Sequence, residues 1–254
     1  TVTFKYDALG RRIEKVFDGR VYRYLWNGDV ILHEWDYAEA DRPNTIVTET
    51  GEVTLDRPEP VENPITWVYD SDSYVPTAKI VGDRHYSIVS DYIGRPVQAY
   101  DDNGNIVWQA DYDIYGNVRN LHGSRQFIPF RQLGQYEDEE TGLYYNRFRY
   151  YDPRIGNYIS QDPIRLGGGM SLYAYVHDTN SWIDLLGLSG MPKGGWNYGN
   201  MPKLDGYQLH HVIPKSMAEH PAIKAAGFDV NKPSNLIYLP IEDGSHTTRS
   251  IHNG

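Results

Sequence analysis

Two adjacent histidines near the end of the chain are the first residues whose side chains could take part in catalysis. His210 and His211 precede an apolar pair and a proline, Asn235 stands before a short strand-like run, and His246 and His252 follow. An imidazole can take a proton from water near neutral pH, and a second can hold a divalent metal ion beside a phosphate. Adjacent strand residues point to opposite faces, so the two histidines need a strand end or bend to serve one site.

Two aspartates offer a second kind of chemistry. Asp162 and Asp184 lie 22 residues apart. Two carboxylates brought together can share a proton, so that one activates water and the other protonates a leaving amine. The spacing alone does not bring them together, and by itself it favours aspartates that form turns.

The composition limits the elements that could position these residues. Of 254 residues, 40% are hydrophobic and 13% aromatic, which is enough for a packed core and excludes wholesale disorder. Cysteine is absent, which excludes a disulfide scaffold, a cysteine nucleophile and a cysteine-ligated zinc or iron–sulfur site. No apolar run approaches the roughly 20 residues that span a bilayer, so we expect no membrane-spanning segment. The chain opens without Met inside a repeated pattern, so we expect a piece of a longer protein.

Charge and residue type change near residue 188. Residues 1–188 carry 19 of the 22 tyrosines and 29 acidic against 18 basic residues. Residues 189–254 carry 5 acidic against 6 basic residues and five of the nine histidines. Linker chemistry rich in Gly, with Ser, Pro and Lys, lies at 188–195. We therefore predict two domains, 1–188 and 189–254.

The first domain repeats a short aspartate–glycine unit. Tyr6–Arg11 recurs at 91–95 and 112–117, with a weaker copy at 100–105. Alternating runs such as 21–26 and 105–112 flank these units, and alternation is the strand period, while Asp-Gly and Asn-Gly chemistry supplies turns. We predict a chain of β-hairpins, with an ordinary antiparallel sandwich as the alternative. Residues 38–63 are acidic and proline-bearing, and they are expected to form a loop excursion.

These units resemble the YD repeats of Rhs proteins and of the related toxin-complex shells. The run from Leu133 to Ile164 is similar to the signature that closes Rhs cores, and the resemblance covers roughly residues 1–188. It implies a hollow β-cocoon that holds a C-terminal toxin and ends at a self-cleavage site. The family's usual ending is Asp-Pro-x-Gly-Leu, and Leu185 stands here in place of Pro. By this resemblance, Asp162 and Asp184 are the catalytic pair, with Asp178 as a substitute, and cleavage falls between Leu188 and Ser189.

Residues 209–252 resemble the AHH branch of the HNH/endonuclease-VII nuclease toxins, with Leu209 where that name has Ala. The resemblance implies that His211 is the general base, that His210 binds a divalent metal ion (Mg, Mn or Zn) together with His246 or His252, and that Asn235 is the central Asn. A helical stretch is expected from about 216 to 226. His220 is expected to be a helix-surface residue. The family usually supplies another His and an aromatic helix after the point where this chain stops, so we expect an incomplete domain.

The second domain contains few basic residues. Lys215 and Arg249 are the candidate phosphate contacts, and Lys193, Lys203, Lys224 and Lys232 are further lysines that could contribute. A near-neutral domain lacks the broad basic footprint typical of DNA binding. The resemblance nevertheless favours DNA as the substrate, and RNA stays open.

The combined prediction is a mainly β chain: a Rhs/YD-repeat hairpin shell segment, then a small α+β HNH-like (ββα-metal) toxin domain. The resemblance implies a secreted antibacterial effector, made in the producer cytoplasm and acting in the target-cell cytoplasm. Its implied partners are a cognate immunity protein, its own shell, and secretion components such as a type VI spike and chaperone. Two alternatives stay open: a non-enzymatic cell-surface or carbohydrate-binding β-repeat protein, and an effector with another toxin chemistry, such as a peptidase or deaminase. The absence of Cys and of a His-x-Glu motif argues against a zinc deaminase.

Overall fold

The computed structural model describes residues 1–71, 73–165, 171–188, 190–192, 207–226, 228–231 and 235–240. Contacts within the chain divide it into two units, Thr1–Gly190 and Met191–Gly254, which are described separately. In the described ranges, no helix is both long and apolar enough to cross a membrane.

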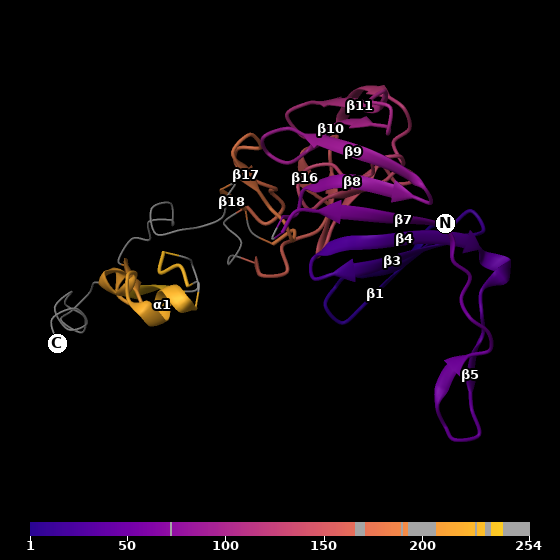
Figure 1. The fold of residues 1–254 in the computed structure, drawn as a ribbon, viewed down its shortest axis with the longest axis horizontal. Coiled ribbons are helices and arrows are strands. Elements are labelled where there is room, and N and C mark those ends of the chain that lie inside the picture. The colour runs from indigo at the N-terminus through magenta and orange to yellow at the C-terminus, as the bar shows by residue number, and fades with distance from the viewer. Residues whose placement is uncertain are drawn as a thin grey trace. The chain divides into compact units, whose positions relative to one another are not determined.

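The first unit is built on a ten-stranded antiparallel sheet whose strand order nearly follows the sequence (Figure 1). Each strand pairs with the next along the chain, except that β4 pairs with β7. The strands are β1 (Thr3–Tyr6), β2 (Arg12–Phe17), β3 (Arg20–Asn27), β4 (Val30–Ala38), β7 (Glu62–Tyr69), β8 (Pro76–Val81), β9 (Arg84–Ser90), β10 (Pro96–Tyr100), β11 (Ile106–Tyr112) and β12 (Val118–His122). The predicted chain of hairpins is confirmed.

The repeated aspartate–glycine units are the turns between these strands. In the first unit, Oδ1 of Asp7 accepts hydrogen bonds from the backbone N–H groups of Leu9 and Arg11 at 2.9 and 2.8 Å. Its Oδ2 accepts from Arg11 Nε at 2.6 Å, and Gly10 supplies a φ of +74°. An Asp side chain that bonds the backbone two residues ahead, followed by a Gly with positive φ, is a self-contained turn. The same backbone contacts recur at Asp91, Asp101 and Asp113.

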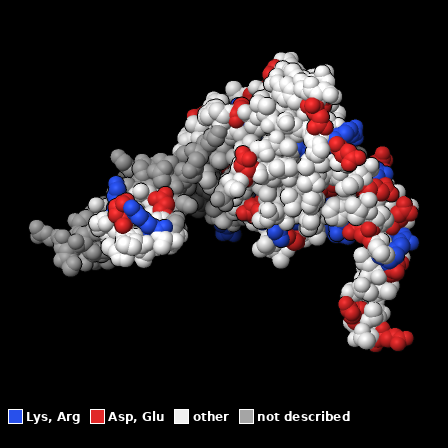
Figure 2. Space-filling view, viewed as in Figure 1, with Lys and Arg blue, Asp and Glu red and all other residues white. Residues whose placement is uncertain are grey.

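The excursion between β4 and β7 contains more structure than the predicted loop. It holds a short 3-10 turn (Glu39–Asp41) and a hairpin of β5 (Thr45–Val47) and β6 (Val53–Leu55). Every residue of both strands is exposed, and the hairpin projects away from the sheet (Figure 1). Acidic side chains gather at its tip (Figure 2). β-Branched residues on both sides of a Gly51 turn favour this hairpin despite the flanking prolines.

The core lies on one face of the sheet, under residues 125–140, which we call the covering segment. The rings of Phe130 and Trp67 meet edge to face with their centres 4.7 Å apart, and Phe127 meets Tyr86 in the same way at 5.0 Å. Trp67 is fully buried. Aromatic side chains carry large buried areas, so these contacts tie the covering segment to the sheet.

The signature, which overlaps the end of the covering segment, folds into a second, four-stranded antiparallel sheet. Its strands are β13 (Tyr136–Asp138), β14 (Leu143–Asn146), β15 (Arg149–Asp152) and β16 (Asn157–Tyr158), and β17 (Trp182–Ile183) follows. Tyr144, Tyr151, Tyr158 and Tyr175 form a buried tyrosine cluster on it. The tyrosine-rich composition therefore builds a core here, with each ring buried.

The second unit begins with β18 (Met191–Pro192) and contains a hairpin of β19 (Tyr207–His211) and β20 (Leu236–Pro240). Between these strands lie a 3-10 turn (Lys215–Met217) and α1 (Pro221–Ala225). The predicted helix from 216 to 226 is therefore broken in two. The cause is Pro221, because the residue before a proline is driven to extended backbone, as at His220. The predicted fold class, a mainly β shell segment followed by a small α+β unit, is confirmed.

Candidate functional sites

The first candidate site is a buried ionic cluster at the end of the first unit. Arg149, on β15, directs its Nη2 to Oδ2 of Asp162 at 3.1 Å and to Oδ2 of Asp184 at 3.3 Å. All three side chains are at most 5% exposed. Residues distant in the sequence are thus brought to one point, where one guanidinium contacts both carboxylates.

Asp184 is also tied to the chain just ahead of the predicted cleavage point. Its Oδ1 accepts a hydrogen bond from the backbone N–H of Leu188 at 3.0 Å, and its Oδ2 accepts from the Tyr158 hydroxyl at 2.9 Å. Arg149 Nε donates to the carbonyl oxygen of Gly187. Gly187 has a φ of +68°, and an added Cβ would lie 2.4 Å from the carbonyl oxygen of Asn146. Only glycine fits this close approach.

The ring of Tyr158 lies against the guanidinium, with its centre 3.7 Å from Cζ of Arg149. Burial, followed by the charge of Asp184, raises the pKa of Tyr158 well above its usual value. Its hydroxyl therefore stays a donor to Asp184 at neutral pH. Asn146 Nδ2 supports this arrangement by donating to the Tyr158 hydroxyl at 2.7 Å and to the backbone oxygen of Asp184 at 2.9 Å.

Sequence reasoning missed Arg149, Tyr158 and Asn146 as members of this cluster. All three lie in the signature from 133 to 164. The sequence offered a signal for Arg149, which is a basic residue within an otherwise aromatic strand. Asp178, the predicted substitute, is instead a turn residue that accepts from Asn180 N–H at 3.0 Å and from the Ser181 hydroxyl. Ser189 lies outside the described residues.

The second candidate site is the end of β19 in the second unit. His210 and His211 are each 8% exposed, and His211 is the last residue of the strand. The strand end that the histidine pair requires is therefore present. His211 Nε2 lies 3.1 Å from Oδ1 of Asn231. An amide oxygen only accepts hydrogen bonds, so this contact fits the tautomer with its proton on Nε2 and Nδ1 as the basic nitrogen.

Asn235 holds the backbone around this strand end. It is 1% exposed, and its Oδ1 accepts from the N–H of Ile213 at 2.7 Å. Its Nδ2 donates to the carbonyl oxygens of Ile213 at 2.9 Å and Val230 at 2.7 Å. These contacts bring the end of β19 and the loop before β20 together. Sequence reasoning missed Asn231, whose only signal was a second amide residue close to Asn235.

Of the residues predicted to bind a metal ion, the structure describes His210 alone. An imidazole suits a divalent transition metal as one ligand of several. Within the described ranges, no three His, Cys, Asp or Glu side chains converge as a metal-binding group. The other predicted ligands, His246 and His252, and the predicted phosphate contact Arg249 lie outside the described residues. His210 therefore fits the predicted role of one ligand, and His211 keeps the predicted role of the base.

Two further predicted residues have clear positions. Lys215 opens the 3-10 turn after the histidines. His220 is the N-cap of α1, where its Nδ1 accepts from the N–H of Ala222 at 3.2 Å, so its role is structural.

Comparison with known families assigns most of the chain. Residues 1–167 match the teneurin YD-shell family. The chain belongs to this YD-shell family. Its residues 191–254 match AHH, a nuclease family of the HNH/endonuclease VII superfamily. The chain therefore combines a YD-shell segment with a following segment that matches an AHH nuclease family.

Two curated relatives of this YD-shell chain are much longer than it is. A double-stranded DNA deaminase toxin A of Burkholderia cenocepacia is 33% identical over 80% of this chain and 15% of the relative. A probable deoxyribonuclease RhsB of Dickeya dadantii is 34% identical over 75% of this chain and 12% of the relative. The chain thus spans less than a sixth of these relatives. A Photorhabdus luminescens Tc holotoxin pore shares the fold, with a TM-score of 0.54 and 20% identity over 74% of this chain and 9% of that one.

Proposed function

We propose that this chain is part of a secreted antibacterial effector whose AHH domain degrades target-cell DNA with a divalent metal ion. The observation that carries the proposal is His211 at the end of a strand with its imidazole bonded to Asn231. Supporting it are the AHH match and the deoxyribonuclease name of a relative. The experiment described below tests RNA as the alternative substrate.

In this proposal, His211 takes a proton from water at Nδ1 while the water oxygen attacks the phosphorus atom of a phosphodiester. The bond from phosphorus to the leaving oxygen breaks, and that oxygen takes up a proton from the solvent. His210, with His246 or His252, would hold the metal ion, which when bound supplies charge stabilisation for the phosphate oxygens. Lys215 and Arg249 would contact neighbouring phosphates. Asn235 would keep the strand end in shape through its backbone contacts.

We further propose that the chain cuts itself between Leu188 and Ser189. Asp162 and Asp184 would act together: one takes a proton from the attacking water, and the other delivers a proton to the nitrogen of Ser189 as the peptide bond breaks. Support comes from the ion pairs of Arg149 with both carboxylates and from its hydrogen bond to the carbonyl oxygen of Gly187. The hydrogen bond between Asp184 and the N–H of Leu188 is further support. Arg149 would position the pair and the chain end.

The proposed encapsulation, delivery and immunity are inferred from the family. A complete shell would enclose the cleaved toxin, a type VI spike and chaperone would deliver it from the producer, and an immunity protein would protect that producer. The toxin would act in the target-cell cytoplasm. The deaminase relative aligns over most of the chain, so a shared shell does not identify the toxin. The AHH match at 191–254 favours a nuclease over a deaminase here.

The decisive experiment compares wild type with His211→Ala and His210→Ala on plasmid DNA and on RNA. Chelator should silence the wild type, and added Mg²⁺, Mn²⁺ or Zn²⁺ should restore it. His211→Ala should stay inactive at any metal concentration, because the proton acceptor is gone. His210→Ala should recover in part at high metal concentration, because it loses affinity only. His220→Ala is the control and should retain activity. Full activity of a folded His211→Ala chain would refute the nuclease proposal.

A further inference from the structure

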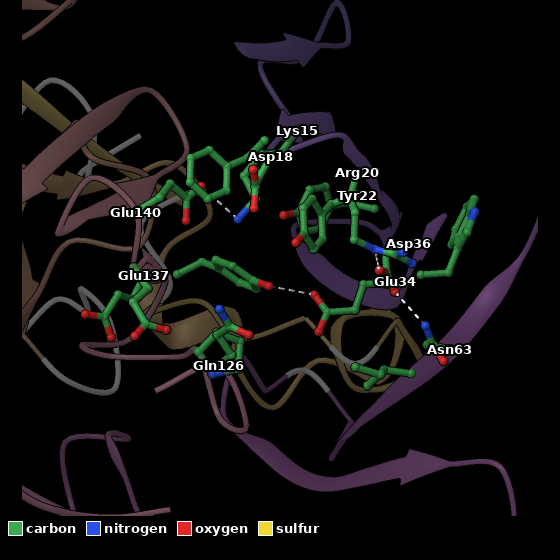
Figure 3. Close-up of a pocket in the computed structure, with 17 residues that line it drawn as sticks. Lys15, Asp18, Arg20, Tyr22, Glu34, Asp36, Asn63, Gln126, Glu137 and Glu140 are labelled. Carbon is green, nitrogen blue, oxygen red and sulfur yellow. Dashed lines mark hydrogen bonds and ion pairs between the residues drawn. The ribbon is translucent and has the colours of Figure 1, made fainter. Parts of the chain in front are cut away.

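A pocket of about 550 Å³ lies in the first unit and shares no residue with the Arg149 cluster. Strands β2, β3, β4 and β7 form one side, and the covering segment forms the other. Pockets of roughly 300–1,000 Å³ are typical of small-molecule sites. Figure 3 shows Glu34 and Asp36 on one side of it, and Glu137 and Glu140 on the opposite side.

The pocket is strongly acidic. Its lining holds two basic residues, and both already have partners: Lys15 Nζ lies 2.9 Å from Glu140 Oε1, and Arg20 pairs with Asp36 (Figure 3). Glu137 pairs with arginines of the covering segment. Three carboxylates of the lining form no ion pair with any described residue: Asp18, Glu34 and Glu139. The lining therefore holds more acidic than basic side chains, six against two.

Glu34 is the buried member of this group. It is 8% exposed, and its Oε2 accepts a hydrogen bond from the neutral Tyr136 hydroxyl at 2.8 Å. Lys79, the nearby buried cation, donates instead to the carbonyl oxygen of Phe127 at 2.8 Å. Burial raises the pKa of Glu34. The charges of Lys79 and Lys15 offset only part of the cost of burying this carboxylate, so an entering cation gains the remaining attraction.

The walls of the pocket are aromatic, and their rings already contact cations. Lys15 Nζ lies 4.6 Å from the centre of the Tyr22 ring. Cζ of Arg12 lies 4.8 and 5.1 Å from the ring centres of Tyr24 and Tyr136. Ring faces attract ammonium and guanidinium groups and pack against their alkyl stems. Acidic groups combined with aromatic walls select a cation that has an apolar chain.

We propose that this pocket binds an aliphatic organic cation, an ammonium or guanidinium group on a flexible carbon chain. Glu34 is the anion that receives the charge, and the tyrosine rings hold the stem. A lysine or arginine side chain of a peptide and a free diamine share this chemistry. The proposal is independent of the nuclease and of self-cleavage, because the pocket shares no residue with either site.

The test is calorimetric titration of the chain with three probes. They are the peptide acetyl-Gly-Lys-Gly-amide, its norleucine counterpart, which lacks the charge, and cadaverine. The lysine peptide should bind, and the norleucine peptide should bind at least tenfold more weakly. Glu34→Gln keeps an acceptor for Tyr136 and should weaken lysine-peptide binding at least tenfold. Glu49→Gln removes an equal charge from the exposed β5–β6 hairpin and should change nothing.

A second measurement does not depend on any variant. Saturation transfer from the wild-type protein should fall most strongly on the ε-methylene protons of the lysine peptide, which lie beside the rings. If cadaverine binds as tightly as the lysine peptide, the ammonium group and its carbon chain are the whole ligand. If the peptide binds more tightly than cadaverine, the peptide backbone is recognised as well. Equal binding of the lysine and norleucine peptides would overturn the proposal. Undiminished binding to folded Glu34→Gln, or saturation away from the ε-methylene group, would overturn it as well.

Discussion

Asp162 and Asp184 meet at a single nitrogen atom: Nη2 of Arg149 lies 3.1 Å from the first carboxylate and 3.3 Å from the second. The same guanidinium donates to Gly187, one residue before Leu188. A pair of acids and the end of the shell segment are therefore held by one side chain. This geometry turns two unremarkable turn-forming residues into a candidate active site.

Replacing either aspartate should keep the chain whole. Asp162→Asn and Asp184→Asn remove a proton acceptor or donor but preserve shape, so each should abolish separation at Leu188/Ser189 on a denaturing gel. Asp178→Asn is the matched control, because Asp178 caps an unrelated turn, and that variant should cleave normally. Cleavage that persists in both Asp162→Asn and Asp184→Asn would rule out this pair.

Asn231 and Asn235 should affect different properties of the second unit. Asn231→Ala removes the group that orients His211, so nuclease activity should fall roughly tenfold or more with little loss of stability. Asn235→Ala leaves one N–H and two carbonyl groups without their partner and should cost about 3 kcal/mol of stability. Paired activity assays and thermal melts distinguish the two. The assignment fails if Asn231→Ala is fully active.

Arg12 should matter far more to stability than its neighbour Arg11. Arg12 is fully buried, pairs with Asp138 at 2.6 Å and links the first repeat to the signature sheet. Arg12→Met leaves Asp138 buried and without this partner, which should cost about 3–5 kcal/mol. Arg11→Met breaks a partly exposed pair with Asp7 and should cost about 1 kcal/mol or less. Urea denaturation measures both, and similar losses would contradict the prediction.

The stability of the first unit should peak near pH 10. Burial lowers the pKa of Lys79 to about 8, so the folded chain binds fewer protons than the unfolded chain between pH 8 and 10, and stability rises there. Burial raises the pKa of Tyr112 and Tyr145 to about 12, so the folded chain holds protons that the unfolded chain loses, and stability falls from pH 10 to 12. Denaturant titrations across this range give the curve. Tyr112→Phe should flatten its alkaline side, and constant stability from pH 10 to 12 would contradict it.

Local patterns alone were enough to predict the hairpins and their turns. Alternating residues such as those at 21–26 encode a strand, and the turn at Asp7 closes through contacts within five residues. Such elements need no distant partner, so they are readable from the sequence. The break at Pro221 and the hairpin within 38–63 are also local, and a closer reading of the proline and of the β-branched residues around Gly51 would have shown both.

The sites were decided by tertiary structure. The sequence by itself determined that acids, histidines and an asparagine of the right types were present, in an order that resembles two known families. It could not show that Arg149 stands between Asp162 and Asp184, because that depends on how β15 packs against segments that follow much later in the chain. The same holds for Glu34, whose burial is created by the covering segment some hundred residues away. Desolvation and ion pairing act through space, so the chemistry of these groups follows from the fold.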